Sequence, residues 1–184
     1  PGKDWEVMSG TSMATPHVAG VVALLRSQEE NLTPLEIRNR LMETSDEIYN
    51  LKRRVGARGR INAYNAVHRI FLEKDPAEAL WHSEDIWVES EHPYRAKKEV
   101  HWVLKHPGAA WVRVHFSRFT TERFDRVLIQ SSNGKVVEGL SDDHDDYVSE
   151  PVRGDTLIVR LIADLNVQRY GFQIDRLDYV PAKF

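Results

Sequence analysis

The 184-residue chain contains no cysteine, no long apolar run and no excess of basic residues. The absence of cysteine excludes disulfides, thiolate metal sites and a cysteine nucleophile. No segment approaches the roughly 18 consecutive apolar residues of a membrane-spanning helix, so we expect no membrane partner. The formal net charge of -3 argues against a nucleic-acid partner, because nucleic-acid-binding proteins carry a basic surface that attracts phosphates.

The composition is that of a soluble globular protein, with 41% hydrophobic and 29% charged residues. A chain of this length can bury a sizeable core, either in one domain or in two small ones. It opens with Pro1 and Gly2 instead of methionine. We therefore expect it to be the interior of a longer polypeptide, and the lack of a targeting peptide has little meaning.

The N-terminal part carries signals for helices. Residues 12–25 are apolar on nearly every face and rich in small side chains, which predicts a buried helix enclosed by other elements. Residues 33–36 read Thr-Pro-Leu-Glu, a combination of N-cap, first-turn proline and capping box that predicts the start of a second helix. Asn62 can cap a third helix that we expect to continue through Phe71 and to stop at Asp75-Pro76.

From about Ile86 the pattern changes to short β-rich segments separated by turn residues. These segments are 100–104, 111–116, 126–130, 135–140, 156–162 and 170–179. Asn133-Gly134 is a strong hairpin signal between two of them, because both residue types accept positive φ. We therefore predict an antiparallel β-sandwich and divide the chain into a helical part at 1–75, a linker at 76–85 and a sandwich at 86–184.

Residues 9–20 read Ser-Gly-Thr-Ser-Met-Ala-Thr-Pro-His-Val-Ala-Gly. Gly10 has no side chain and permits another group to approach its backbone closely. Ser12 is predicted to lie at the N-terminal end of the first helix. Free backbone N–H groups and the positive end of the helix dipole would then face an oxyanion formed there. The alternative interpretation is a small-residue turn in which Ser12 only caps a core helix.

Over its whole length this segment resembles the nucleophile motif of the subtilisin family. The resemblance implies that residues 1–75 are the helical, C-terminal portion of a subtilisin-like α/β domain, so the chain as a whole is α+β. It also implies that Ser12 is the catalytic nucleophile and that the Ser12 backbone N–H is one donor of the oxyanion hole. In the family's chain order the catalytic Asp and His, and the side-chain amide of the oxyanion hole, precede the serine and lie outside this chain. His17 is not the base, because it lies about one and a half helical turns beyond Ser12 and points elsewhere.

The resemblance implies a serine endopeptidase that hydrolyses peptide bonds through an acyl-enzyme at Ser12. Its partners would be a protein or peptide substrate and the missing N-terminal part of the catalytic domain, and its location extracellular or exported. A serine hydroxyl without its histidine is a weak nucleophile, so we predict that this chain alone is inactive. No cofactor is required for this chemistry.

Residues 86–179 resemble CUB-type jelly-roll domains, although the cysteines of animal CUB domains are absent. The positions that carry this resemblance include residues 91–94, 122–125 and 163–172. It implies a calcium site at Glu122, Asp125 and Asp164, with carbonyl groups near Asn166 as further candidates. The other interpretation is that these acidic residues merely occupy polar loops. A non-catalytic, calcium-dependent binding module released from a protease is therefore our alternative function.

Overall fold

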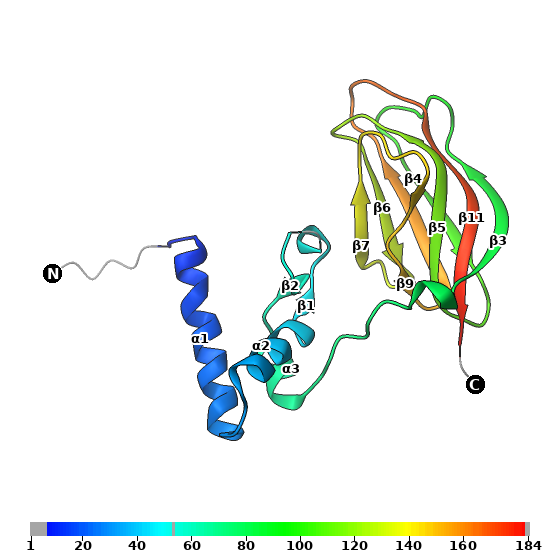
Figure 1. Cartoon of the computed structure of the whole chain (residues 1–184). Coiled ribbons are helices and arrows are strands. Elements are labelled where there is room, and N and C mark those ends of the chain that lie inside the picture. The colour runs from blue at the N-terminus through cyan, green and yellow to red at the C-terminus, as the bar shows by residue number, and fades with distance from the viewer. Residues whose placement is uncertain (1–6, 53, 183–184) are drawn as a thin grey trace. The chain divides into compact units, whose positions relative to one another are not determined.

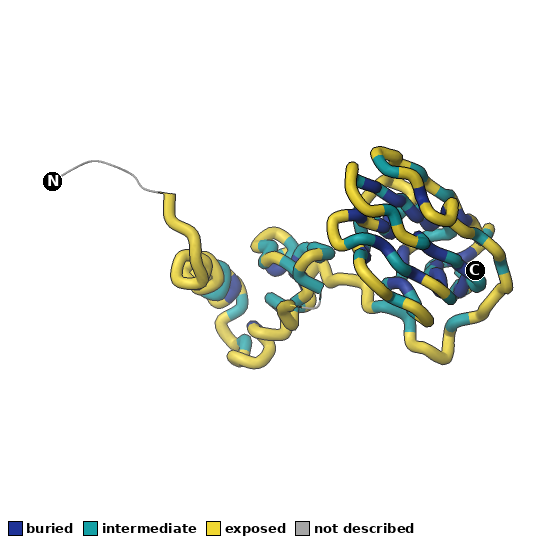
Figure 2. The backbone as a smooth tube through the Cα atoms, turned by 90° about the horizontal axis from the view of Figure 1, so that it is seen from above, coloured by how far each residue is buried: buried dark blue, intermediate teal, exposed yellow. Residues whose placement is uncertain are grey.

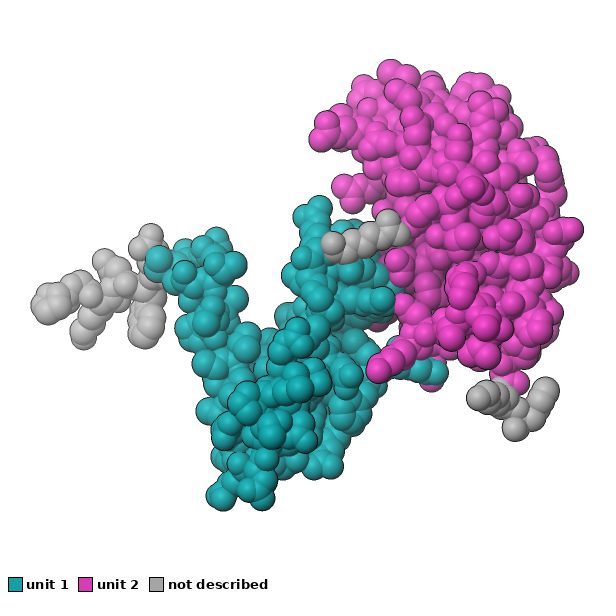
Figure 3. Space-filling view, viewed as in Figure 1, with its two compact units in different colours: residues 1–73 teal, residues 74–184 magenta. Residues whose placement is uncertain are grey.

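The computed structural model describes residues 7–52 and 54–182 (Figure 1). The chain divides into two compact units, Pro1–Glu73 and Lys74–Phe184 (Figure 3). Among the described residues, none of the helices combines the length and the apolar composition that a membrane crossing needs.

The described residues of unit 1 form three helices, a small antiparallel pair of strands and a short 3-10 turn. In chain order they are α1 (Thr11–Gln28), α2 (Pro34–Glu43), β1 (Asp46–Glu47), η1 (Tyr49–Leu51), β2 (Gly59–Arg60) and α3 (Ala63–His68). The predicted capping box of α2 is confirmed, because the Thr33 hydroxyl accepts from the Glu36 N–H while the Glu36 carboxylate accepts from the Thr33 N–H. The Asn62 side chain caps α3 by accepting from the Asn65 N–H, also as predicted.

The prediction that the first helix is enclosed is wrong for this structure. Within α1 only Leu25 is buried, Val21 and Val22 are half-buried, and the other residues are exposed (Figure 2). The buried core of unit 1 is Leu25, Ile37 and Ala66, one residue from each helix. The physical reason is that the small and apolar residues in the first turns of α1 have no packing partner among the described residues of unit 1.

The third helix is shorter than predicted. It ends at His68, where Arg69 adopts a left-handed conformation with φ of 55° and donates its N–H to the Asn65 carbonyl. Ile70 and Phe71 therefore lie outside the helix and are 47% and 51% exposed. Apolar spacing suggested a continuing helix, but the left-handed residue ends it in the manner of a C-cap.

Unit 2 is a sandwich of two antiparallel sheets. One sheet has the order β4-β10-β6-β7, and the other has the order β3-β11-β5-β8 with β9 also paired to β5. The strands are β3 (His82–Glu89), β4 (Glu99–Lys105), β5 (Ala109–Thr120), β6 (Arg126–Ser131), β7 (Val136–Leu140), β8 (Tyr147–Val148), β9 (Val152–Arg153), β10 (Thr156–Ile162) and β11 (Gly171–Pro181). The predicted antiparallel sandwich is thus confirmed.

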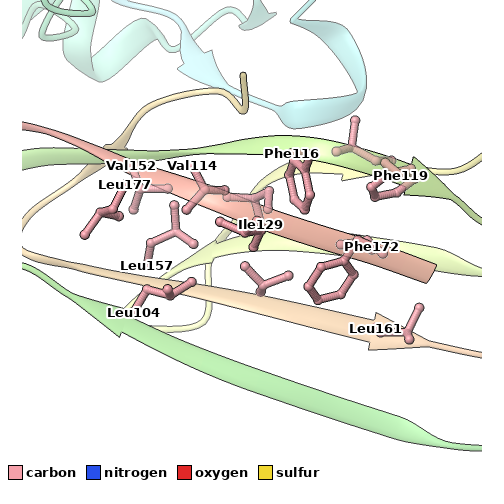
Figure 4. Close-up of a cluster of buried hydrophobic side chains, with 14 of the residues drawn as sticks. Leu104, Val114, Phe116, Phe119, Ile129, Val152, Leu157, Leu161, Phe172 and Leu177 are labelled. Atoms are coloured by element: carbon pink, nitrogen blue, oxygen red, sulfur yellow. The ribbon is translucent and has the colours of Figure 1, made fainter. Parts of the chain in front are cut away.

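Alternating burial along the strands builds the core between the sheets. In β10, Leu157, Val159 and Leu161 are buried while the residues between them are half-exposed. Phe116 lies edge-on to both Phe119 and Phe172, with ring centroids 5.3 and 5.7 Å away. Figure 4 shows these aromatic side chains between the two layers. The period-2 pattern read from the sequence is therefore the pattern of inward-facing side chains.

The Asn133-Gly134 turn joins β6 to β7 as the hairpin signal predicts. Gly134 has φ of 81° and donates its N–H to the Ser131 carbonyl, while the Asn133 side chain accepts from the Lys135 N–H. The strands β8 and β9, of two residues each, were not predicted. Strands this short offer no alternation that a sequence pattern can register.

The predicted linker at 76–85 differs from the structure. Unit 2 begins at Lys74, the 3-10 turn η2 spans Glu78–Leu80, and β3 already begins at His82. The first residues of β3 are polar and exposed, so they show no apolar alternation. Their strand conformation comes from pairing with β11, where the Ser83 hydroxyl donates to Asp178 at 2.8 Å.

Candidate functional site

Ser12 lies in the first turn of α1 and is exposed. Gly10 precedes the helix as its N-cap, with φ of 149° and ψ of 167°. The first helical hydrogen bonds run from the N–H groups of Met13 and Ala14 to the Gly10 carbonyl, at 3.1 and 3.2 Å. The N–H of Ser12 therefore precedes the hydrogen-bonded turn and is one of the helix's free donors.

The electrostatics at this helix end favour negative charge. The helix α1 has 18 residues, and its first turn contains no acidic side chain. Its aligned peptide dipoles place a partial positive charge near Ser12. An oxyanion next to the Ser12 hydroxyl would thus be stabilised by the dipole and by at least one backbone N–H.

No base assists the Ser12 hydroxyl within the described residues. The hydroxyl has no hydrogen-bond partner there. His17 is exposed on the same helix, five residues further along. At about 100° per residue its side chain projects roughly 140° around the helix from Ser12, which agrees with its rejection as the base.

A groove of about 530 Å³ lies between α1 and α2. Its apolar lining includes Val18, Val22, Ile37 and Leu41. Val18 is 40% exposed, and Leu24 on the same helix is 43% exposed. Exposed apolar surface beside a groove can mark an interaction site, so this side of α1 is a candidate interface.

Unit 2 brings the three predicted metal ligands together. One carboxylate oxygen from each of Glu122, Asp125 and Asp164 lies within 4.8 Å of the others. Asp125 is 1% exposed, whereas Glu122 and Asp164 are half-buried. Glu122 and Asp125 come from the loop between β5 and β6, and Asp164 comes from the loop between β10 and β11. We call this group the carboxylate cluster.

Hydrogen bonds from neutral donors position the cluster. Asp125 accepts from the Tyr94 hydroxyl and from the Asp164 N–H, the latter at 2.7 Å. Asp164 accepts from the N–H and the side-chain amide of Asn166, and Glu122 accepts from the Phe124 N–H at 2.7 Å. Among the described residues, no Lys or Arg side chain pairs with a cluster carboxylate. Three negative charges are thus held together without a protein countercharge.

The cluster residues fit a calcium ion. Calcium binds six to eight oxygens at 2.3–2.6 Å, so two of its ligand oxygens lie up to about 5 Å apart. The spacing of the three carboxylate oxygens, within 4.8 Å, satisfies this limit. Each carboxylate also has lone pairs beyond those used by its hydrogen bonds. Glu122, Asp125 and Asp164 could therefore hold one hard divalent cation.

Tyr94 is a part of this site that the sequence analysis missed. It is 3% exposed, and its hydroxyl donates to Asp125 while accepting from the Glu122 N–H at 3.1 Å. Burial and the hydrogen bond to Asp125 raise the pKa of Tyr94 to about 12. The phenol therefore stays protonated and links the two acidic residues. Its signal in the sequence is its place in the segment 91–94, which is one of the segments that resemble CUB-type domains.

The N-terminal segment also has relatives among known proteins. Residues 2–71 match the subtilase family, described as Peptidase_S8. Thermophilic serine proteinase from Bacillus sp. (strain AK1) is 50% identical over 66 residues, which are 36% of this chain and 16% of that protein. Thermitase from Thermoactinomyces vulgaris is 46% identical over 67 residues, which are 36% of this chain and 23% of that protein. The chain thus spans less than a quarter of either relative's length.

The sandwich has distant structural neighbours. The extracellular region of zebrafish Gpr126/Adgrg6 is 19% identical with a TM-score of 0.43, covering 56% of this chain and 14% of that one. The CUB1-EGF-CUB2 domain of human MASP-1/3 is 15% identical with a TM-score of 0.41, covering 57% of this chain and 42% of that one. Both TM-scores lie below 0.5, so these two structures support no conclusion about this chain beyond a distant likeness.

Proposed function

We propose that this chain is the nucleophile-bearing part of a subtilisin-like serine endopeptidase. The observation that carries the proposal is the position of Ser12, which stands in the subtilase segment 2–71 and in the first turn of an 18-residue helix. There the Ser12 hydroxyl attacks the carbonyl carbon of a peptide bond, and its backbone N–H donates to the oxyanion that forms. Collapse of the oxyanion breaks the C–N bond and releases the amine, which receives the proton of the Ser12 hydroxyl through the histidine of the missing part. Water then hydrolyses the acyl-enzyme and regenerates the free Ser12 hydroxyl. The substrate is a protein or peptide, and the location is extracellular or exported.

The missing N-terminal part of the catalytic domain is the main partner in this proposal. It would supply the histidine that deprotonates Ser12, the aspartate that orients this histidine, and the second oxyanion donor. The exposed apolar face of α1 and the groove beside it support the proposal, because an interface of this kind needs a covering element. Alone, the chain would therefore not hydrolyse peptides.

A fluorophosphonate probe tests the role of Ser12, because it labels only activated serines. We expect no labelling of the isolated chain and rapid labelling of the native polypeptide that includes the upstream part. Ser12→Ala should abolish both labelling and peptidase activity of that longer polypeptide, with a loss in turnover of about 10⁶-fold, the size established for subtilisin. Ser27→Ala, on the same helix, is the matched control and should retain both. Rapid labelling of the isolated chain at Ser12 would contradict the proposal.

A second candidate function is favoured by the carboxylate cluster. We infer that unit 2 is a calcium-dependent binding module, whether attached to the protease or released from it. The uncompensated carboxylates of Glu122, Asp125 and Asp164 support this inference. Bound calcium would neutralise their repulsion and tie the two loops that carry them.

Calorimetric titration with calcium tests the module. We expect a single site on the full chain, with an affinity in the range of about 10⁻⁴ to 10⁻³ M typical of extracellular modules. Asp164→Asn should weaken binding by at least about tenfold, because it removes one of three ligand charges. Asp143→Asn removes an exposed acidic residue outside the cluster and serves as the control. No heat at millimolar calcium would refute the site.

A further inference from the structure

Three large apolar side chains project from the two loops that carry the carboxylate cluster. Phe124 is 69% exposed, Leu165 is 63% exposed and Val167 is 62% exposed. Phe124 directly precedes Asp125, and Leu165 directly follows Asp164. We call Phe124, Leu165 and Val167 the loop tips. In the described part of unit 2 only three other large apolar residues are exposed, namely Leu80, Trp87 and Val103.

The loops that bear these tips are fastened to one another. The Asp164 N–H donates to Asp125 at 2.7 Å, which joins the β5–β6 loop to the β10–β11 loop. A third segment, residues 90–98, is tied to both through Tyr94, whose hydroxyl reaches Asp125 and whose N–H donates to the Arg169 carbonyl at 3.3 Å. These hydrogen bonds fix the loops with the tips facing the solvent, although burying the tips would stabilise an isolated domain.

The polar surroundings of the tips include two arginines in addition to the carboxylate cluster. Arg123 precedes Phe124 and Arg169 follows Val167 by two residues, and both side chains are exposed. Neither arginine has an ion-pair partner among the described residues. Two unpaired guanidinium groups beside three apolar tips match the interface of an anionic bilayer, where the tips can enter the acyl region and the arginines can meet phosphates.

The carboxylate cluster can add to the same surface. Glu122 and Asp164 are half-buried, so a cation held there would be reachable from the solvent beside the tips. Calcium takes six to eight oxygen ligands, and a lipid phosphate can complete a set that the three carboxylates begin. Without the cation, the three negative charges would repel an anionic surface.

We propose that the loop tips Phe124, Leu165 and Val167, flanked by Arg123 and Arg169, dock unit 2 onto an anionic phospholipid bilayer, and that calcium at the carboxylate cluster strengthens the docking. The calcium part rests on the proposed calcium-binding function. This docking is peripheral and differs from the expectation of no membrane partner. That expectation followed from the lack of a long apolar run, whereas the tips come from separate loops that only the fold brings together.

Vesicle sedimentation with the full chain tests the proposal. The probes are vesicles of phosphatidylcholine mixed with phosphatidylglycerol, and vesicles of phosphatidylcholine alone. We expect binding to the mixed vesicles in millimolar calcium to exceed binding to the neutral vesicles, or binding in a chelator, by at least about tenfold. Equal binding to both vesicle types, or none to either, would overturn the proposal.

A triple variant separates the loop tips from the exposed helix α1, which is also apolar. Phe124→Ala/Leu165→Ala/Val167→Ala should fold normally because all three side chains are exposed, and it should lose at least about tenfold in binding to the mixed vesicles. Leu80→Ala is the matched control. Leu80 is 50% exposed and lies two residues before His82, which pairs with Tyr179 in β11. The cluster loops adjoin the other end of β11, where Gly171 pairs with Thr120, so Leu80 lies away from them. Binding that is unchanged in the triple variant would refute the assignment of the docking surface.

Calcium calorimetry on the same samples separates the two proposals. Calcium heat without vesicle binding would overturn the docking surface and leave the calcium module standing. Vesicle binding that requires the loop tips, but occurs without calcium heat, would support the docking surface and overturn the role of calcium. The absence of both signals would overturn both.

Discussion

The two units differ sharply in how they bury their apolar residues. In the described residues, the core of unit 2 contains eighteen buried hydrophobic side chains, whereas the core of unit 1 contains three. Unit 1 nevertheless exposes large apolar residues such as Met13, Val18 and Leu24 along α1. A sandwich of two complete sheets can satisfy its own inward faces, but an apolar helix without a sheet cannot. The difference leaves the apolar surface of α1 uncovered within the described residues of unit 1.

The largest expected effect on stability comes from removing a large side chain from the core of unit 2. Phe116 is 0% exposed and packs edge-on against Phe119 and Phe172. Phe116→Ala should lower the free energy of unfolding of unit 2 by about 3 to 5 kcal/mol, from lost burial and the cavity left behind. Urea unfolding followed by tryptophan fluorescence measures this, because Trp81, Trp87, Trp102 and Trp111 all lie in unit 2.

Phe116→Leu keeps most of the volume and serves as the control, with a smaller loss. A loss below about 1 kcal/mol for the alanine variant would contradict the close packing of the sandwich.

A second effect concerns alkaline pH. The pKa of Tyr94 is about 12 in the folded chain, against an ordinary value of 10.0, because burial and the hydrogen bond to Asp125 favour the neutral phenol. A raised folded pKa contributes stability that is complete below pH 10 and is lost as the pH rises toward 12. We expect unit 2 to lose about 2 to 3 kcal/mol over this interval. Urea unfolding at several pH values measures the loss.

Tyr94→Phe should be less stable at neutral pH and should show less of this alkaline loss. Tyr64→Phe is the matched control, because Tyr64 is 64% exposed and lies in unit 1. An identical alkaline profile for the Tyr94 variant and the unmodified chain would refute the assignment.

A third, smaller effect tests the local stability of unit 1. Thr33→Ala removes the capping box of α2 and should lower the stability of unit 1 by about 1 kcal/mol. Far-UV circular dichroism at the helical band measures the melting of this unit, since its three helices dominate that signal. Thr33→Ser retains the hydroxyl and should restore most of the stability. Equal melting of all three proteins would show that the cap does not stabilise unit 1.

The smallest expected effect on stability comes from a substitution on α1, compared with the same substitution in the sandwich core. Val18→Ser on α1 should change the stability of the isolated chain by no more than about 0.5 kcal/mol, because Val18 is 40% exposed. The same substitution at Val114, which is 0% exposed in β5, should cost several times more by burying a hydroxyl in the core. If the two variants lost equal stability in separate measurements of their units, α1 would be packed as firmly as the sandwich.

Much of the fold followed from local patterns. The capping box at Thr33 and Glu36, the Asn62 cap and the Asn133-Gly134 turn each depend on residues adjacent in sequence, and each is present as predicted. The strand β10 spans Thr156–Ile162, the same residues that its alternation indicated. Local hydrogen bonding and side-chain alternation act over a few residues, so a single sequence contains the information needed.

Other features depended on partners distant in sequence. The first half of β3 is polar and becomes a strand because β11 pairs with it. The enclosure expected for α1 is absent because, among the described residues of unit 1, no element covers its first turns. The candidate metal site was likewise predicted from the sequence only in part. Its carboxylates were chosen by resemblance, while Tyr94, which joins them, was recognised only from its contacts.

The sequence by itself determined the local features of this chain. It specified a segment around Ser12 that resembles the subtilisin nucleophile motif, two regions with different periodicities, and three acidic residues on two separate loops. The tertiary structure alone decided that these carboxylates meet within 4.8 Å, that Tyr94 lies beneath them, and that Phe124 and Leu165 project outward beside them. The physical reason is that motifs and periodicity arise from neighbours along the chain, whereas burial, charge clustering and exposed apolar surface arise from segments that only folding brings together.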